Sequence, residues 1–251
     1  CLGYGQCEKI SELAKKNRFT QKKSTRYSYS GGDKVTSIRI SRFNKKGVET
    51  GYTFQHYTED LKKTKAKYFF DKNKNKIREH RYKVDGTIGD SLRYEYDDRN
   101  NVIKDEFYRG GMFDSYTVYV YDSLCHKIGY TAYLSDSSVW LQYAWEYDNN
   151  HHITSFTDLS HTQIKTIYEN NEHGNAIKLT DYNQGGDKIE ERIQKNEYKK
   201  KNLIKKTSYD KDGNETQKSE YKYDKRGNVV EKIDYSKGEI AWKEVTEYTY
   251  Y

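Results

Sequence analysis

The stretch Tyr221-Lys-Tyr223-Asp224-Lys-Arg-Gly227-Asn228-Val229-Val230 decides the fold, because close variants of it recur about every 25 residues along the 251-residue chain. It consists of aromatic residues at alternate positions, an Asp, a turn ending in Gly-Asn and a short apolar run. Further copies begin at Phe69, Tyr94, Tyr119 and Trp145. A repeat of this length is one supersecondary unit that buries surface only against its neighbours. The sequence therefore predicts one repeat domain.

The spacing of the copies predicts β-hairpins. The second aromatic position of each copy is occupied in turn by Phe43, Phe70, Tyr96, Tyr121, Tyr147, Asn170, Tyr198, Tyr223 and Tyr250. Each interval accommodates two strands of ordinary length and two turns. We expect about nine hairpins with 17–18 strands, forming an all-β, elongated, curved antiparallel meander. A sheet of so many strands is longer than twisted sheets normally tolerate, so it should curl, coil or close.

Turn and strand chemistry support this interpretation. The Asp224 carboxylate is placed to accept backbone N–H groups, and Gly227 is placed where φ must be positive. The second turn of each unit is less regular, as at Gly110-Gly111 and Ser135–Ser138. The sheet should have one uniform edge and one variable edge, and the variable edge is the better candidate for function. The chain contains no Pro, as expected where most residues sit in strand ladders or tight turns.

Composition indicates a thin core. Apolar and charged residues each make up 33% of the chain, and 27 Tyr argue against disorder. Tyr rings and the stems of Lys and Arg would cover the sheet. The net charge is +7, but cations and acids are interleaved, which favours a solvated surface on both sides. Since no nucleic-acid-binding motif is present, we expect no nucleic-acid partner.

At Tyr223-Asp224 and Gly227-Asn228 the sequence resembles the RHS/YD-repeat family, and Tyr96-Asp97 and Tyr121-Asp122 extend the resemblance. The resemblance implies a strip of β-hairpins that spirals into a shell or sheet, in an extracytoplasmic setting. It implies no activity. The chain departs from large members in being short and lacking a conspicuous self-cleaving C-terminal module.

The first residue, Cys1, gives the chain a resemblance to a mature bacterial lipoprotein. We expect a covalent lipid on Cys1, no other cofactor, and anchoring at the bacterial outer membrane, on its periplasmic or surface face. Alternatively, Gly3-Tyr4-Gly5 is a signal-cleavage site and residues 1–5 are a remnant. Apolar spacing over residues 6–17 predicts a short capping helix. The expected organisation is a tether and helix at 1–24 and a repeat domain at 25–251.

Residues with chemical potential are few. Asp71 opens a calcium-like loop, but Lys76 and Tyr82 stand where the motif requires Gly and Glu. His151 and His152 are adjacent and would face opposite sides of a strand, away from a shared ion. No catalytic motif is present. We expect neither an enzyme nor a metal site.

The densest aromatic region is the candidate binding surface, comprising Tyr133, Trp140, Tyr143, Trp145 and Tyr147. One hypothesis is a non-catalytic, lipid-anchored scaffold subunit that binds an outer-membrane or envelope protein through an extended face or exposed sheet edges. The alternative is a carbohydrate-binding surface lipoprotein whose Tyr and Trp rings are platforms for a glycan. The same residues also fit plain sheet ladders that pack against each other.

Overall fold

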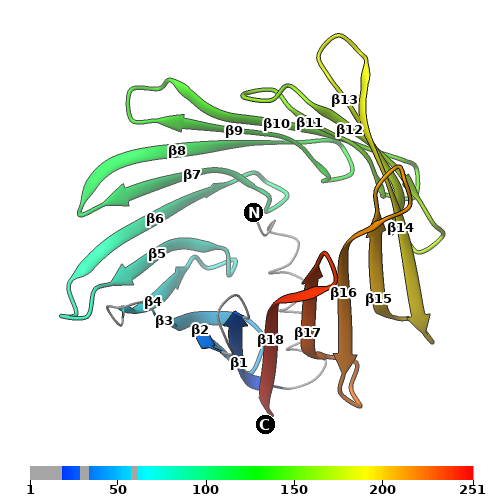
Figure 1. Ribbon diagram of the computed structural model, residues 1–251. Coiled ribbons are helices and arrows are strands. Elements are labelled where there is room, and N and C mark those ends of the chain that lie inside the picture. Colours follow the sequence, from blue (N-terminus) through cyan, green and yellow to red (C-terminus); the bar gives the residue numbers. More distant parts are fainter. Residues whose placement is uncertain (1–18, 29–33, 58–61, 251) are drawn as a thin grey trace.

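The structure is a computed structural model that describes residues 19–28, 34–57 and 62–250, and within these residues every regular element is a β-strand (Figure 1). The strands are β1 (Phe19–Ser28), β2 (Lys34–Phe43), β3 (Glu49–His56), β4 (Lys62–Phe70), β5 (Lys76–Tyr82), β6 (Ile88–Tyr96), β7 (Val102–Arg109), β8 (Met112–Tyr121), β9 (Lys127–Leu134), β10 (Val139–Tyr147), β11 (Ile153–Asp158), β12 (Lys165–Asn170), β13 (Ala176–Tyr182), β14 (Lys188–Lys199), β15 (Asn202–Tyr209), β16 (Glu215–Tyr223), β17 (Val229–Ser236) and β18 (Glu239–Tyr250).

The sheet is closed into a barrel. Each strand pairs antiparallel with the next, and β1 pairs with both β2 and β18. The expectation of an elongated, curved meander is therefore wrong. The physical reason is the accumulated twist of 18 strands, which brings the first and last strands together and lets them satisfy their edge hydrogen bonds.

The number of strands and the phase of the repeat are confirmed. Eighteen strands form nine hairpin repeats, and the second aromatic position ends or nearly ends every even-numbered strand from Phe43 to Tyr250. β1 begins at Phe19, so the barrel includes residues 19–24, which the sequence division had placed with the tether. The predicted helix over 6–17 and the lipidation residue Cys1 lie outside the described residues.

The two faces of the barrel differ in burial and charge. Directly paired residues of antiparallel strands share a face, so the register can be followed around the barrel. One face holds most buried side chains, including Tyr52, Glu79, Tyr94, Asp105 and Tyr119. Side chains converge on the concave side of a closed sheet, so this is the inward face.

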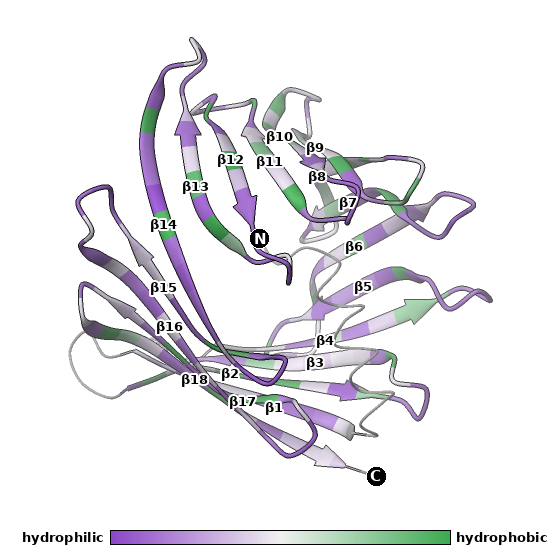
Figure 2. Cartoon of the chain, turned by 90° about the vertical axis from the view of Figure 1, so that its right-hand side faces the viewer, coloured by the Kyte–Doolittle hydropathy of each residue, from purple (hydrophilic) through white to green (hydrophobic). Residues whose placement is uncertain are grey.

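The outer face carries ion pairs along much of its circumference. Lys and Glu side chains pair between neighbouring strands or along one strand: Lys23–Glu247, Lys104–Glu106, Lys165–Glu146, Lys178–Glu169, Lys205–Glu197, Lys218–Glu220 and Lys243–Glu231. Figure 2 shows strands that are largely hydrophilic, with isolated hydrophobic segments.

Turns divide the barrel into two ends, which we name the strict rim and the variable rim. The strict rim carries the turns at 44–48, 71–75, 97–101, 122–126, 148–152, 171–175, 200–201 and 224–228. In the turn at 224–228, the Asp224 N–H donates to the Asn228 carbonyl (2.9 Å), and the Asp224 carboxylate accepts the N–H groups of Arg226 and Asn228. The variable rim mixes the two-residue turn at 110–111 with a longer loop over 159–164.

Tyr hydroxyls connect successive hairpins. The second aromatic residue of several copies donates its hydroxyl to a backbone carbonyl about one hairpin earlier in the chain. These bonds join Tyr96 to Lys76 (2.9 Å), Tyr121 to Val102 (3.0 Å), Tyr147 to Lys127 (3.1 Å) and Tyr223 to Leu203 (2.7 Å). The repeated Tyr is thus a structural element that fixes each repeat onto the previous one.

Candidate functional site

The five residues of the predicted binding surface do not lie together. Tyr143, Trp145 and Tyr147 alternate along β10 on the inward face. Tyr133 lies on the outer face of β9, where its ring stacks on Tyr116 (4.6 Å between centroids). Trp140 lies at the start of β10, within an irregular pairing, and is 53% exposed at the variable rim. The five residues therefore do not form one surface, because strand alternation and a register shift distribute them over three places.

An inward aromatic sector runs across β8–β11. We define it as Tyr119, Tyr130, Tyr143, Trp145 and Phe156. Ring centroids of Tyr119 and Tyr130 are 5.6 Å apart, as are those of Tyr130 and Tyr143, and Phe156 lies 5.3 Å from Tyr143 and 5.7 Å from Trp145. Four of the five rings are half-buried and keep exposed surface inside the barrel. Sequence reasoning missed Tyr119, Tyr130 and Phe156 because they lie one or two strands away from the Trp-rich segment on β10.

Lys127 lies within this sector. Its Nζ is 4.6 Å from the ring centroid of Trp145, 5.9 Å from that of Tyr119 and 6.0 Å from that of Tyr130. Among the described residues, no carboxylate pairs with this ammonium group. Burial alone lowers the pKa of Lys127 from its ordinary value. The sector therefore combines ring faces with a partly desolvated cation that lies near three rings.

The equivalent position two repeats earlier shows what Lys127 lacks. Lys76 occupies the same place in its repeat, and its Nζ pairs with Glu79 (3.1 Å), three residues along β5. Tyr130 is the residue three positions after Lys127, so a ring replaces the carboxylate. The repeat of Lys127 therefore has the cation but not the carboxylate three residues later. A comparison of repeats in the sequence contained this signal.

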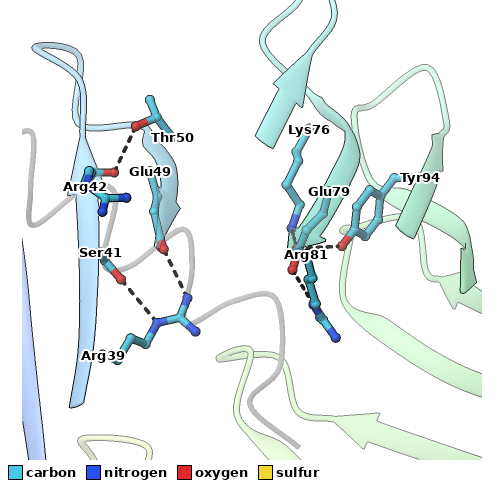
Figure 3. Close-up of polar contacts among 9 residues, drawn as sticks. All are labelled: Arg39, Ser41, Arg42, Glu49, Thr50, Lys76, Glu79, Arg81 and Tyr94. Carbon is cyan, nitrogen blue, oxygen red and sulfur yellow. Dashed lines mark hydrogen bonds and ion pairs between the residues drawn. The ribbon is translucent and has the colours of Figure 1, made fainter. Parts of the chain in front are cut away.

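A separate polar cluster lies on the inward face of β2–β6 (Figure 3). Glu79 is 3% exposed and accepts hydrogen bonds from Lys76 (3.1 Å), Arg81 (2.8 Å) and the Tyr94 hydroxyl (3.4 Å). Burial alone would raise the pKa of Glu79, but the charges of Lys76 and Arg81 outweigh it and lower the pKa. This cluster is internally satisfied, which indicates a structural role.

Two neighbouring groups complete the polar part of the inward face. The guanidinium of Arg39 donates to Glu49 (3.1 Å) and Ser41 (3.3 Å) and lies over the Tyr52 ring (3.8 Å). Asp105 accepts the Tyr119 hydroxyl (2.5 Å), and burial raises its pKa. The Asp105–Tyr119 bond marks the border between the polar cluster and the aromatic sector.

The histidines lie mainly in turns. His126 Nε2 contacts His151 Nδ1 (2.7 Å) between adjacent turns of the strict rim, and His126 Nδ1 contacts Asp122 (2.7 Å). His161 lies in the loop over 159–164, at the opposite rim. Across the described ranges, no three His, Cys, Asp or Glu side chains converge as a metal-binding set. In the same ranges, no helix is long and apolar enough to span a membrane.

Comparisons with known proteins show the fold alone. No protein-family model and no curated protein matches the sequence. A porin-like protein from Bacteroides uniformis is similar in structure, with a TM-score of 0.54 and 9% identity over 92% of this chain and 97% of that protein. A TcdB2–TccC3–Cdc42 complex matches at a TM-score of 0.32 with 12% identity, over 88% of this chain and 17% of that chain. A LolA superfamily protein from Nitrosomonas europaea matches at a TM-score of 0.23 with 11% identity, over 97% of this chain and 91% of that protein. The last two likenesses are too distant to support an argument.

Proposed function

We propose that the chain is a non-catalytic binding protein of the bacterial envelope whose inward aromatic sector holds an acidic saccharide. The observation that carries this proposal is Lys127, an ammonium group among half-buried rings that has no carboxylate partner within residues 19–28, 34–57 and 62–250. A buried cation without a counter-ion is unfavourable, and an anionic ligand would remove that cost. The ring faces of Trp145 and Tyr143 supply flat apolar surfaces, such as those that sugar rings stack on.

The outer face supports a barrel in contact with water. Its Lys–Glu pairs lie on strands along much of the circumference. Each Lys or Arg facing lipid at the bilayer midplane would cost about 2–4 kcal/mol. The envelope location draws on the porin-like fold and the extracytoplasmic RHS/YD resemblance. Lipid anchoring at Cys1 remains part of the proposal, and intact-mass measurement of the native N-terminus tests it directly.

The saccharide proposal predicts a loss of binding from two inward variants. Trp145→Ala removes the principal ring, and Lys127→Met removes the charge while keeping the length of the side chain. We expect each to weaken binding of a uronic-acid oligosaccharide by roughly tenfold or more. Isothermal titration calorimetry with this ligand, and with a neutral oligosaccharide of equal length, is the measurement.

The matched control is Tyr133→Ala, which removes a ring from the outer face of the adjacent strand. It should leave binding within about twofold, while Lys127→Met should affect the acidic ligand more than the neutral one. Equal losses for Tyr133→Ala and Trp145→Ala, or no measurable affinity of the unaltered chain for acidic saccharides, would refute the proposal.

A second candidate function is favoured by a patch at the variable rim. Apolar side chains there are strongly exposed: Met112 (75%), Phe113 (41%), Leu134 (43%), Val139 (53%) and Trp140 (53%). They lie on the β7–β8 and β9–β10 hairpins, which neighbour each other through the β8–β9 pairing. Exposed apolar patches of this kind mark protein-interaction sites. Because the barrel is closed, this rim replaces the free sheet edges that the scaffold hypothesis had invoked.

The exposed apolar patch predicts that an envelope protein binds to the variable rim in a fixed ratio. Trp140→Asp combined with Met112→Asp should abolish co-purification of that partner from native membranes, because each change places a charge at the apolar contact. Saccharide binding inside the barrel should be unaltered. Retention of the partner by the double variant would argue against this function.

A further inference from the structure

Charge is unevenly distributed around the strict rim. Four consecutive turns on one half, at 44–48, 71–75, 200–201 and 224–228, contain eight Lys or Arg and two Asp, a formal charge of +6. The other four, at 97–101, 122–126, 148–152 and 171–175, contain one Arg and five acids, a formal charge of −4. A chain whose cations and acids are interleaved in sequence thus presents a basic half-rim in space. We use that term for the first four turns.

The lysines of the basic half-rim are not neutralised by neighbours. Within the described ranges, no ion pair involves Lys45, Lys46, Lys72, Lys74 or Lys225. The two acids of these turns are engaged elsewhere. Asp71 accepts the backbone N–H and side-chain amide of Asn75, and Asp224 accepts the Tyr250 hydroxyl (2.7 Å). The basic half-rim therefore attracts anions from solution, because few acidic side chains of the same turns offset its positive charge.

An apolar cavity opens between the first two of these turns. It has a volume of about 420 Å³ and is lined by Asn44, Lys45, Lys46, Val48, Phe70 and Lys74. Val48 and Phe70 supply apolar surface, and three lysines border it. A site with an apolar interior and a cationic border fits a ligand with an anionic head and an apolar body.

The two ends of the barrel sheet lie in the same half-rim. Phe19 at the start of β1 pairs with Tyr250 at the end of β18, and Gln21 pairs with Arg42, next to the turn at 44–48. The segment that precedes β1 therefore joins the barrel between two basic turns. A surface that binds the half-rim would also lie next to Phe19, where β1 begins.

We propose that the basic half-rim docks on an anionic phospholipid surface. Lipid phosphates lie among the lysines, and the apolar part of one lipid enters the cavity at Val48 and Phe70. Each Lys or Arg near an anionic bilayer contributes roughly 1 kcal/mol, and several together give appreciable binding. The acidic half of the same rim is repelled by the anionic lipids. The barrel therefore meets the bilayer tilted, and the side formed by β14–β18 and β1–β5 lies nearest to the lipid. This inference uses none of the residues of the saccharide proposal.

Vesicle co-sedimentation tests the proposal, using the full 251-residue chain produced without acylation. Binding to pure phosphatidylglycerol vesicles is expected at low salt, with little binding to pure phosphatidylcholine and a steep loss as salt rises. The test variant replaces Lys45, Lys46, Lys72 and Lys225 by Gln. It should bind phosphatidylglycerol at least roughly tenfold more weakly.

The matched control replaces four variable-rim cations, Lys83, Lys188, Lys211 and Lys237, by Gln, which changes the net charge equally. It should bind within about twofold of the unaltered chain. An equal loss in test and control variants would show that only net charge acts, and would overturn the proposal. Equal binding to phosphatidylcholine, or tighter binding to a DNA duplex than to phosphatidylglycerol vesicles, would also overturn it. Circular dichroism of both variants confirms that they are folded.

Discussion

Replacing Glu79 by Gln is expected to lower the free energy of unfolding by about 3–5 kcal/mol at neutral pH. The Glu79 carboxylate is buried between the cations of Lys76 and Arg81. Removing its charge leaves two inward-facing cations without an anion in a region of low dielectric, and this accounts for most of the loss. Chemical denaturation at pH 7 is the measurement.

The control is Glu95→Gln, on the outer face of β6, where the carboxylate lies 3.5 Å from Lys104 and is largely exposed. The loss of unfolding free energy in this control should stay below about 1 kcal/mol.

The pKa of Glu79 is lowered in the folded state, so the stabilisation by Glu79 is present above the unfolded pKa and is lost as pH falls through the folded pKa. The stability difference between Glu79→Gln and the unaltered chain should therefore shrink in acid. A difference independent of pH, or as small as that of the control, would contradict the assigned ion pairs.

Replacing Gly51 by Ala is expected to cost about 2–4 kcal/mol. Gly51 has a φ of +155°, a conformation that L side chains rarely adopt. A Cβ at this position would overlap the carbonyl oxygen of Ala66 on the neighbouring strand. Because that oxygen belongs to the β3–β4 ladder, relief requires a backbone shift in a closed barrel.

Gly213→Ala separates the overlap from the conformational strain. Gly213 also has positive φ (+83°), but a Cβ there would have no atom within 4 Å. Its cost should be about 1–2 kcal/mol, from backbone strain alone. Thermal unfolding of the two variants in parallel gives the comparison. Equal costs would show that the close approach at Ala66 is not maintained in solution.

The number of strands, their ends and the turn geometry could be predicted from the sequence. The period of the Tyr-x-Tyr-Asp phrase gave the strand number and the strand ends, because a hairpin of fixed length needs a turn at a fixed interval. The Asp-x-x-Gly-Asn chemistry gave the turn geometry at 224–228. The same chemistry at 210–214 occurs at the variable rim, which the motif alone does not reveal, because the order of strands decides the end at which a turn lies.

The candidate site was predicted only in part. Tyr143, Trp145 and Tyr147 share a face because they alternate within one strand, as strand geometry requires. Tyr133 lies on the outer face because it alternates with the inward Tyr130 along β9. Trp140 lies where the β9–β10 pairing shifts register, between Val139 and Leu141. Lys127 was overlooked because it stands out only when its repeat is compared with that of Lys76, in which Glu79 follows three residues later.

By itself the sequence determined the hairpin repeat and its turns, since both depend on residues within one or two strands. Only the tertiary structure decided that the sheet closes, because β1 and β18 are separated by nearly the whole chain and meet through accumulated twist. Closure in turn decided which face is concave, placed Lys127 among the rings of three strands, and gathered the cations of distant turns into the basic half-rim. Each of these properties depends on which strands become neighbours in space.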